Sequence, residues 1–298
     1  MKKLISAMLA VLMVMALCAA AFASGEASDE LFAPMTFPED AKIVSATRYT
    51  VYTKSPSSLQ DAVIKATLYW DLTNDAPYAI RFLQPMLPWD DNGASMGWAC
   101  VADEDLRAEL EAADALVGVE DGVDYAKYLS IGGVVWTGGL GSDPAADVAV
   151  VYTGEIDGQT VALGEYVRSE EGAEWYVDAA MQPAYFLTDD APSEASGEPE
   201  NAASAYTITY KENNGHGVYF WMSDITFPGN MEAIKEFVME NGFDYDYYAD
   251  GGITKNDDGF WQTADAVSGA TLDETPTYLD ILKTLYNDIQ AGDYVEEN

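Results

Sequence analysis

A seven-residue stretch near the end of the chain, DAVSGAT, carries side chains that could serve a group transfer. The candidate site residues in it are Asp265, Ser268, Gly269, Ala270 and Thr271. Because Gly269 and Ala270 have almost no side chain, the active site of another protein could approach the backbone beside the Thr271 hydroxyl. An amphipathic stretch follows, and the N-terminus of a helix stabilises a phosphate group placed near it. Thr271 is therefore a candidate acceptor for a phosphate-bearing group.

Helix capping is the other interpretation of Thr271. Thr271 and Glu274 have the spacing of a capping box, in which the hydroxyl caps a helix and the carboxylate bonds back to the cap. Pro276 would then lie inside the helix, where its ring clashes with the preceding turn. A helix that is capped by Thr275 and has Pro276 in its first position avoids this clash. We favour this second arrangement, which leaves Thr271 in a loop just before the helix.

The stretch DAVSGAT resembles the D-x-x-S/T-G-A-S/T acceptor motif of FMN-binding domains. These domains include the covalent-flavin subunits of the bacterial Rnf and Na⁺-pumping NADH:quinone oxidoreductase complexes, and exported flavoproteins of Gram-positive bacteria. From ordinary residue frequencies, the pattern arises by chance in roughly one chain per thousand of this length. The neighbouring residues are also similar to the family, with an aromatic residue before the motif and an expected helix after it. The resemblance covers about residues 257–290.

In that family, a Mg²⁺-dependent flavin transferase takes FMN from FAD and esterifies its phosphate to the final Thr or Ser of the motif. The resemblance implies that Thr271 carries FMN as a phosphoester and that Asp265 is the acid needed for recognition or for the transfer. It also implies that the loop around them consists of Ser268, Gly269 and Ala270.

Other residues that could bind a cofactor or a metal give weaker patterns. Trp261 and Tyr278 flank the motif and could stack on an isoalloxazine ring, but we favour packing in the hydrophobic core for each. The stretch DYDYYADGG at 244–252 has alternating acids, yet a tyrosine at the third ligand position and a misplaced glycine argue against an EF-hand loop. We interpret GGLG at 138–141 as a flexible loop without the lysine of a P-loop, and the lone His216 as a surface residue in a turn.

The first residues predict export. A pair of lysines precedes a long uncharged apolar run, and AFA at 21–23 precedes a polar stretch, as in a secretory signal peptide that is cleaved before Ser24. An uncleaved membrane anchor is the alternative, because the apolar run approaches the length that spans a bilayer. A lipid anchor on Cys18 is a further alternative, although the preceding residue is large for a lipobox. We expect a signal peptide at 1–23 and a location outside the cell or in the cell envelope.

The composition excludes several classes of protein. The net charge is −37, from 51 acidic and 14 basic side chains, so the field of the chain repels nucleic acid and anionic lipid. We expect no nucleic-acid partner, and a membrane partner only if the signal segment is retained. Hydrophobic residues make up 49% of the chain and aromatic residues 12%, too much for a disordered protein. If Cys18 leaves with the signal peptide, Cys100 is alone and no intramolecular disulfide can form.

An acidic, proline-containing stretch without apolar periodicity, residues 189–204, has the composition of a linker. It divides the chain into an expected N-terminal α+β domain at 36–188 and an expected FMN-binding domain at 205–292. Strands and helices do not alternate regularly in either part, so the expected fold class is α+β, with two α+β domains joined by the acidic linker.

Periodicity within these parts predicts individual elements. Runs of β-branched and aromatic residues predict strands at 42–53, 63–72, 131–138, 147–153, 205–210 and 217–226. Helical spacing of apolar residues predicts helices at 103–118, 230–242 and 275–289. We expect Asn230 to cap the second of these helices and Gly242 to end it.

A faint internal repeat relates EEGAEWYVDAAMQPAYF at 170–186 to NDDGFWQTADAVSGATL at 256–272. An acidic turn with glycine, a tryptophan and an Asp-Ala pair recur in the same order. The alternative is coincidence in a biased composition. If the repeat is real, Trp175 and Trp261 occupy equivalent elements, and the first copy has no threonine at the position of Thr271.

Together these features predict an exported flavoprotein that holds FMN covalently and takes part in extracytoplasmic electron transfer, since flavin accepts one or two electrons. Its expected partners are the flavin transferase that modifies it and a redox partner that the sequence does not identify. No set of a nucleophile and a general base predicts independent catalysis. The alternative is a non-redox cell-surface module that binds a glycan or a protein through its tryptophans and acids.

Overall fold

The structure is a computed structural model. The residues that it describes are 32–51, 62–89, 97–119, 124–141, 150–191, 197–212, 227–243, 246, 254–255, 261–262 and 275–298. The chain forms two compact units, Met1–Thr36 and Phe37–Asn298. Every described helix and strand belongs to the second unit.

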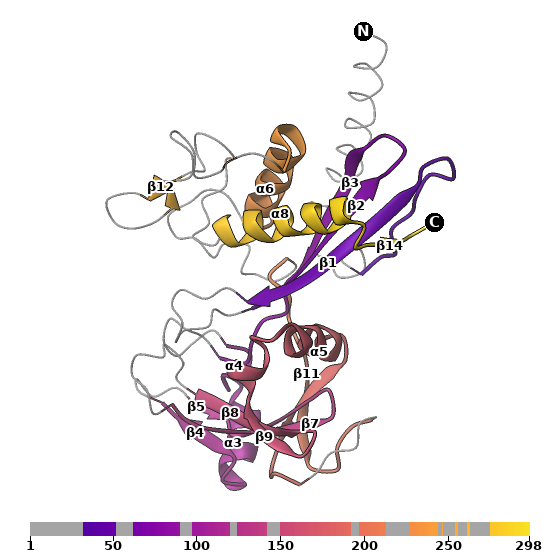
Figure 1. The fold of residues 1–298 in the computed structure, drawn as a ribbon. Helices are drawn as coiled ribbons and strands as arrows, with labels where there is room; N and C mark the ends of the chain where they lie inside the picture. Colours follow the sequence, from indigo (N-terminus) through magenta and orange to yellow (C-terminus); the bar gives the residue numbers. More distant parts are fainter. Residues whose placement is uncertain are drawn as a thin grey trace. The chain divides into compact units, whose positions relative to one another are not determined.

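The first sheet is antiparallel, with four strands in the order β14-β1-β2-β3 (Figure 1). Its strands are β1 (Ile43–Val51), β2 (Val63–Asp71), β3 (Ala76–Leu83) and β14 (Val295–Glu296). β1 and β2 pair over their whole length, and β14 pairs with the start of β1, where Val44 lies opposite Glu296. β1 and β2 confirm the strands predicted at 42–53 and 63–72, whose branched and aromatic residues suit a pleated, half-buried surface.

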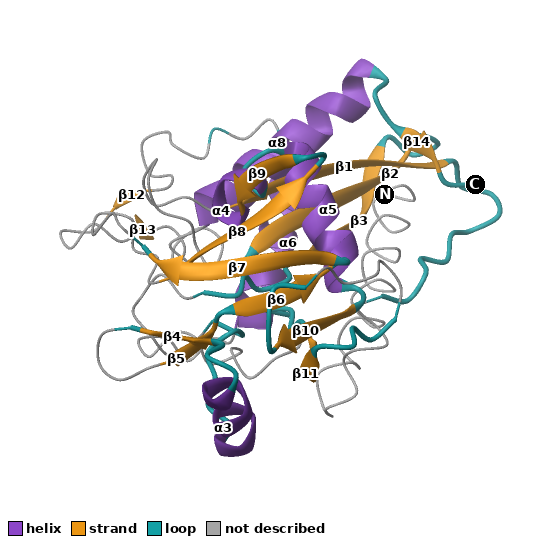
Figure 2. Ribbon diagram, turned by 90° about the horizontal axis from the view of Figure 1, so that it is seen from below, coloured by secondary structure: helices purple, strands orange, loops and turns teal. Residues whose placement is uncertain are grey.

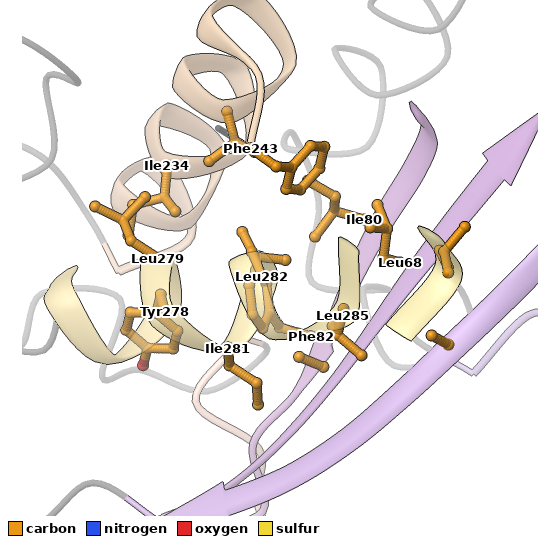
Figure 3. Packing of buried hydrophobic residues seen from close by; sticks show 14 of the residues in the cluster. Leu68, Ile80, Phe82, Ile234, Phe243, Tyr278, Leu279, Ile281, Leu282 and Leu285 are labelled. Carbon is orange, nitrogen blue, oxygen red and sulfur yellow. The ribbon is translucent and has the colours of Figure 1, made fainter. Parts of the chain in front are cut away.

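Two helices, α6 (Phe227–Asn241) and α8 (Thr275–Ala291), pack on this sheet (Figure 1). α8 confirms the helix predicted at 275–289. The apolar residues that predicted it are all buried: Tyr278, Ile281, Leu282, Leu285 and Ile289. They pack against alternate residues of the strands, among them Leu68, Ile80 and Phe82 (Figure 3). The core of the first sheet therefore combines early and late parts of the chain.

The second sheet is also antiparallel, with six strands in the order β11-β10-β6-β7-β8-β9 (Figure 2). Its strands are β6 (Tyr128–Ile131), β7 (Val134–Leu140), β8 (Val150–Ile156), β9 (Gln159–Ala162), β10 (Pro183–Leu187) and β11 (Ala202–Thr207). The helices α4 (Leu163–Tyr166) and α5 (Glu170–Ala180) follow β9 in the sequence. A small hairpin of β4 (Leu116–Gly118) and β5 (Asp124–Ala126) precedes β6.

Strand boundaries in this sheet differ from the predicted ones. The strand predicted at 131–138 is confirmed for residues 134–138, which belong to β7. Its start is wrong, because Ile131 ends β6 and Gly132 and Gly133 turn the chain between the two strands with φ of 56° and 78°. Two successive glycines supply the positive φ of a tight turn, which overrides the continuous apolar pattern. The strands predicted at 147–153 and 205–210 correspond to β8 and β11, each displaced by three residues. The strand predicted at 217–226 lies outside the described residues.

The other two predicted helices also have different bounds. The helix predicted at 103–118 is α3 (Glu104–Ala112), which is capped by the carboxylate of Asp103 and is followed by Asp114 at a φ of 56°. Because of that positive φ, the backbone leaves the helical path and continues into β4 instead. The prediction of Asn230 as a cap is wrong, because α6 begins at Phe227 and Asn230 lies fully buried within it. Gly242 ends α6 with a φ of 80°, as expected.

The expected arrangement of two domains is not confirmed. The hydrophobic core on the first sheet joins β1, β2 and β3 from the expected N-terminal domain with α6 and α8 from the expected C-terminal one. The end of the expected linker at 189–204 belongs to the second sheet, because β11 begins at Ala202 and pairs with β10. The expected α+β fold class is confirmed, since the described fold mixes helices with antiparallel sheets.

The structure favours coincidence over the internal repeat. Trp175 lies in helix α5, whereas Trp261 lies in β13 (Trp261–Gln262), a short strand that pairs with β12 (Thr254–Lys255). Two copies of one unit would place equivalent residues in elements of the same kind, so the positions of these two tryptophans argue against the repeat.

Candidate functional site

The residues of the predicted attachment site lie outside the described part of the chain. They are Asp265, Ser268, Gly269, Ala270 and Thr271. The described elements nearest to them in the sequence are the β12–β13 hairpin before the motif and α8 after it. The described part of α8 includes Thr275 and has Pro276 in its first turn, where proline is tolerated. The motif therefore precedes a helix, as the sequence predicted.

The first turn of α8 is held to the first sheet by Tyr278. Its side chain is fully buried, and its ring packs edge-on against Phe82 of β3 with 5.4 Å between the ring centroids. Its hydroxyl donates a hydrogen bond of 2.5 Å to Oε1 of Gln84. Figure 3 shows the ring among the apolar side chains of the cluster, with the oxygen directed away from them. Tyr278 thus packs in the core, the interpretation that we favoured over stacking on a flavin.

Gln84 also forms hydrogen bonds to Glu212. The side chain of Gln84 is fully buried just beyond the end of β3, and its Nε2 donates to Oε1 of Glu212 at 2.8 Å. The backbone N–H of Gln84 donates to Oε2 of the same carboxyl at 3.2 Å. In return, the backbone N–H of Lys211 donates to the carbonyl oxygen of Gln84 at 3.0 Å. Glu212, Gln84 and Tyr278, which we call the Glu–Gln–Tyr chain, thereby connect three distant parts of the sequence.

The backbone around the Glu–Gln–Tyr chain is paired, so its geometry is well defined. Pro85 and Tyr210 form an isolated antiparallel bridge, and the N–H of Met86 donates to the carbonyl oxygen of Thr209 at 2.9 Å. The segments that follow β3 and β11 therefore run side by side. This pairing fixes Gln84 and Glu212 opposite each other without help from a side chain.

The electrostatic environment of Glu212 is unusual for a carboxyl. Burial raises its pKa from 4.5 to about 7, although the hydrogen bonds from Gln84 and the charge of Lys211 act in the opposite direction. Burial, and then the nearby Glu212 carboxyl, also raise the pKa of Tyr210. A carboxyl of this kind gains or loses its proton close to neutral pH, whereas an ordinary glutamate does so in acid.

Sequence reasoning missed Gln84 and Glu212. Glu212 belongs to KENNGH, a stretch that looks like an ordinary turn, and Gln84 directly precedes a proline after a strand. The separation of Gln84 from Tyr278 is 194 residues, so no local pattern relates them. The available signal was weak: a glutamine next to an apolar run is a candidate for burial, and a buried polar side chain requires a partner.

The remaining sequence candidates receive little support from the described residues. GGLG at 138–141 is not a flexible loop, since β7 runs to Leu140 and Gly138 lies against the ring of Tyr152. Cys100 is half-buried, and burial followed by the charge of Asp124 raises the pKa of its thiol. His216 and nearly all of the acidic stretch at 244–252 lie outside the described residues.

Tryptophans on an exposed surface would favour the glycan-binding alternative. Among the described residues, the fully or almost fully buried tryptophans are Trp70, Trp89, Trp98 and Trp136, and Trp175 is half-buried. Trp98, for example, stacks on Tyr206 with 5.3 Å between the ring centroids and donates from Nε1 to the carbonyl oxygen of Met86. These rings pack in the core and offer no exposed face on which a sugar could stack.

Within the described ranges, no group of three or more metal-ligating side chains is gathered that could hold an ion, and no helix is long and apolar enough to cross a membrane. Comparison of the chain with protein-family models, with curated proteins and with solved structures yields no match. The resemblance to FMN-binding domains therefore rests on the residues of the motif and its immediate neighbours.

Proposed function

We propose that the protein is an exported flavoprotein that carries FMN on Thr271 through a phosphoester and serves in electron transfer outside the cytoplasm. The complete D-x-x-S-G-A-T pattern from Asp265 to Thr271, which ends four residues before α8, carries this proposal. When bound, FMN would supply one- and two-electron redox chemistry.

The position of α8 supports attachment at Thr271. The backbone N–H groups in the first turn of a helix have no partner within the helix, and they favour negative charge by about 0.3–1 kcal/mol. The anchored Tyr278 keeps that turn in place against the sheet. The nearby Asp273 and Glu274 oppose a phosphate dianion, and the helix N-terminus offsets part of that repulsion.

The transfer needs a second protein. In the proposed reaction the hydroxyl oxygen of Thr271 forms a bond to the phosphorus of the FMN half of FAD, the pyrophosphate bond breaks, AMP leaves, and the hydroxyl proton is lost. Asp265 would serve recognition or transfer, and Ser268, Gly269 and Ala270 would form the loop that the transferase approaches. Export favours a covalent bond, because a dissociable flavin outside the cell would be lost by dilution.

Coexpression with a flavin transferase tests the proposal. After denaturation, the peptide that contains Thr271 is expected to carry the added mass of one FMN and to retain flavin fluorescence. Thr271→Ala should abolish the adduct, and Asp265→Ala should reduce it. Thr263→Ala, which removes a threonine outside the motif, is the matched control and should be labelled normally.

The outcome also separates the proposal from its alternatives. A wild-type chain that never acquires flavin, together with a Thr271→Ala variant that unfolds, would favour the capping-box interpretation. A colourless native protein would favour a non-redox surface module. Mass spectrometry of the native N-terminus tests export independently: an end near Ser24 is expected, whereas an intact segment 1–23 or a lipid on Cys18 would place the protein at the membrane.

A further inference from the structure

The direction of each hydrogen bond in the Glu–Gln–Tyr chain follows from the charge of Glu212. An ionised carboxylate only accepts hydrogen bonds, and here it receives one from Nε2 and one from the backbone N–H of Gln84. The amide of Gln84 must then present its other end, Oε1, to Tyr278. Because Oε1 only accepts, the Tyr278 hydroxyl must donate. The charge on one residue thus dictates the role of another on a different element.

We propose that Glu212 is a positioning residue for the first turn of α8, and that its protonation reverses the hydrogen bonds through which Gln84 holds Tyr278. In the protonated state, the new O–H of Glu212 donates to Oε1 of Gln84, whose amide turns over. Nε2 of Gln84 then donates to the hydroxyl oxygen of Tyr278, and the hydroxyl proton of Tyr278 is redirected. The added proton comes from the solvent and forms the O–H bond of Glu212; the other changes are in hydrogen bonding alone.

This inference does not rest on flavin attachment, because it concerns only described residues. It adds a regulated contact to the start of α8, next in sequence to the proposed attachment segment. Among the described residues, the charged and titratable groups beside the Glu212 carboxyl are Lys211, which favours its ionised form, and Tyr210, which lies on the same segment. Gln84, just beyond the end of β3, bonds directly to the carboxyl, and Tyr278 of α8 is connected to it through Gln84.

The pH window follows from the burial of Glu212. Its pKa is about 7 in the folded protein and 4.5 for the ordinary group, so the folded state binds the proton more tightly than the unfolded chain. The contribution of Glu212 to stability is therefore full below pH 4.5 and is lost as the pH rises to about 7. Within this window the folding equilibrium constant falls by up to about tenfold per pH unit because of this one group.

Nuclear magnetic resonance of the full chain with ¹³C at the tyrosine Cζ position tests the proposal. The signal of Tyr278 is the one that disappears in Tyr278→Phe, which keeps the ring and loses only the hydroxyl. In the wild type, this signal is expected to move with pH with a midpoint near 7, because the hydroxyl changes from donor to acceptor. Glu212→Gln should hold the signal at one position throughout. Glu240→Gln, which changes an exposed glutamate of α6, should leave the titration intact.

The single histidine, His216, is the group that could imitate this behaviour, since an ordinary histidine titrates at about 6.5. His216→Gln should retain the titration of Tyr278, and loss of the titration in that variant would overturn the proposal. A Tyr278 signal that stays constant in the wild type, or that still moves in Glu212→Gln, would overturn it as well.

A measurement that needs no variant covers the case in which Glu212→Gln or Tyr278→Phe does not fold. Hydrogen exchange of the α8 amides in the wild type, corrected for the intrinsic pH dependence of exchange, should show protection that falls as the pH rises through the window. Constant protection between about pH 5 and 7 would contradict the proposal. A Glu212 carboxyl that stays ionised throughout this range predicts that constant value.

Discussion

Gly172, in the first turn of α5, lies directly against the backbone of the preceding turn. Its N–H donates to the hydroxyl oxygen of Ser169 at 3.0 Å, and that hydroxyl donates to the carbonyl oxygen of Tyr166 at 2.8 Å. A Cβ atom on Gly172 would overlap the carbonyl group of Tyr166. The absence of a side chain is therefore what allows α5 to start so close to the end of α4.

We predict that Gly172→Ala lowers the free energy of unfolding by about 1–3 kcal/mol, because backbone atoms cannot move aside as a flexible side chain can. Gly139→Ala is the matched control, since a Cβ there would meet nothing within 4 Å. It should change stability by less than about 0.5 kcal/mol. Chemical denaturation monitored by tryptophan fluorescence measures both values, and equal effects of the two substitutions would refute the packing argument.

The candidate site shows what single residues reveal in a sequence and what they do not. The motif that ends at Thr271 is a contiguous pattern, so it can be found by its spacing alone. Glu212 and Gln84 cannot, because their partnership depends on how the segments after β3 and β11 run side by side. Burial changes the acid–base behaviour of Glu212, and burial follows from the tertiary fold rather than from the neighbours in the sequence.

At the scale of elements, the residues that follow α8 bind to β1 and to the segment that leads into it. Gly292 ends α8 with a φ of 84°, and β14 then pairs with β1. Oδ1 of Asn298 accepts from the backbone N–H of Ile43 at 2.9 Å, while its Nδ2 donates to the carbonyl oxygens of Pro38 and Ala41. One side chain thereby satisfies the backbone at the entrance to β1.

Asn298→Ala is expected to destabilise the protein by about 1–2 kcal/mol, because the N–H of the fully buried Ile43 loses its acceptor. Glu296→Ala serves as the comparison. It removes an ion pair with Lys42 in which both side chains are more than half exposed, at 53% and 63%, so solvent screens it. Thermal unfolding should show a clear loss for the first variant and almost none for the second; the reverse order would contradict this account.

Periodicity predicted the elements that have an exposed and a buried face. The apolar residues of α8 recur at helical spacing because one side of the helix lies on the sheet, and those of β1 and β2 suit a surface that is partly buried. The prediction failed where the chain reverses inside an apolar run, at Gly132 and Gly133. It also missed β14, whose two residues become a strand only through pairing with β1.

At the scale of the whole described unit, contacts cross the boundary that composition suggested. Besides the shared core on the first sheet, Arg48 of β1 makes a two-point ion pair with Asp288 of α8, at 2.8 and 3.1 Å, and bonds to Glu170 of α5 at 3.2 Å. The acidic stretch at 189–204 has the composition of a linker, yet it connects two strands that take part in one compact unit. The composition of a segment indicates how readily water solvates it, but it does not indicate which elements pack together.

We therefore expect residues 205–298, expressed alone, to remain unfolded. The buried faces of α6 and α8 would have no sheet to pack on, and isolated helices of this length are marginal in water. Residues 37–298 are the control and should unfold in a single cooperative transition. Near-ultraviolet circular dichroism of both proteins decides the question, since a folded 205–298 fragment would restore the division into two domains.

The pairing of β14 with β1 also has a consequence for the order of events during synthesis. The backbone N–H of Ile43 finds its acceptor 255 residues later, and the sheet that begins there is covered by helices that follow residue 226. A chain that leaves the ribosome from its N-terminus therefore cannot complete this core until residue 298 has been synthesised. Contacts between residues so distant in sequence form slowly, because a long loop must close, at a cost in entropy, before any of these contacts can stabilise the fold. If the protein is exported as we propose, we expect the nascent polypeptide to stay extended inside a narrow secretion channel, and to complete its core only after residue 298 has passed through.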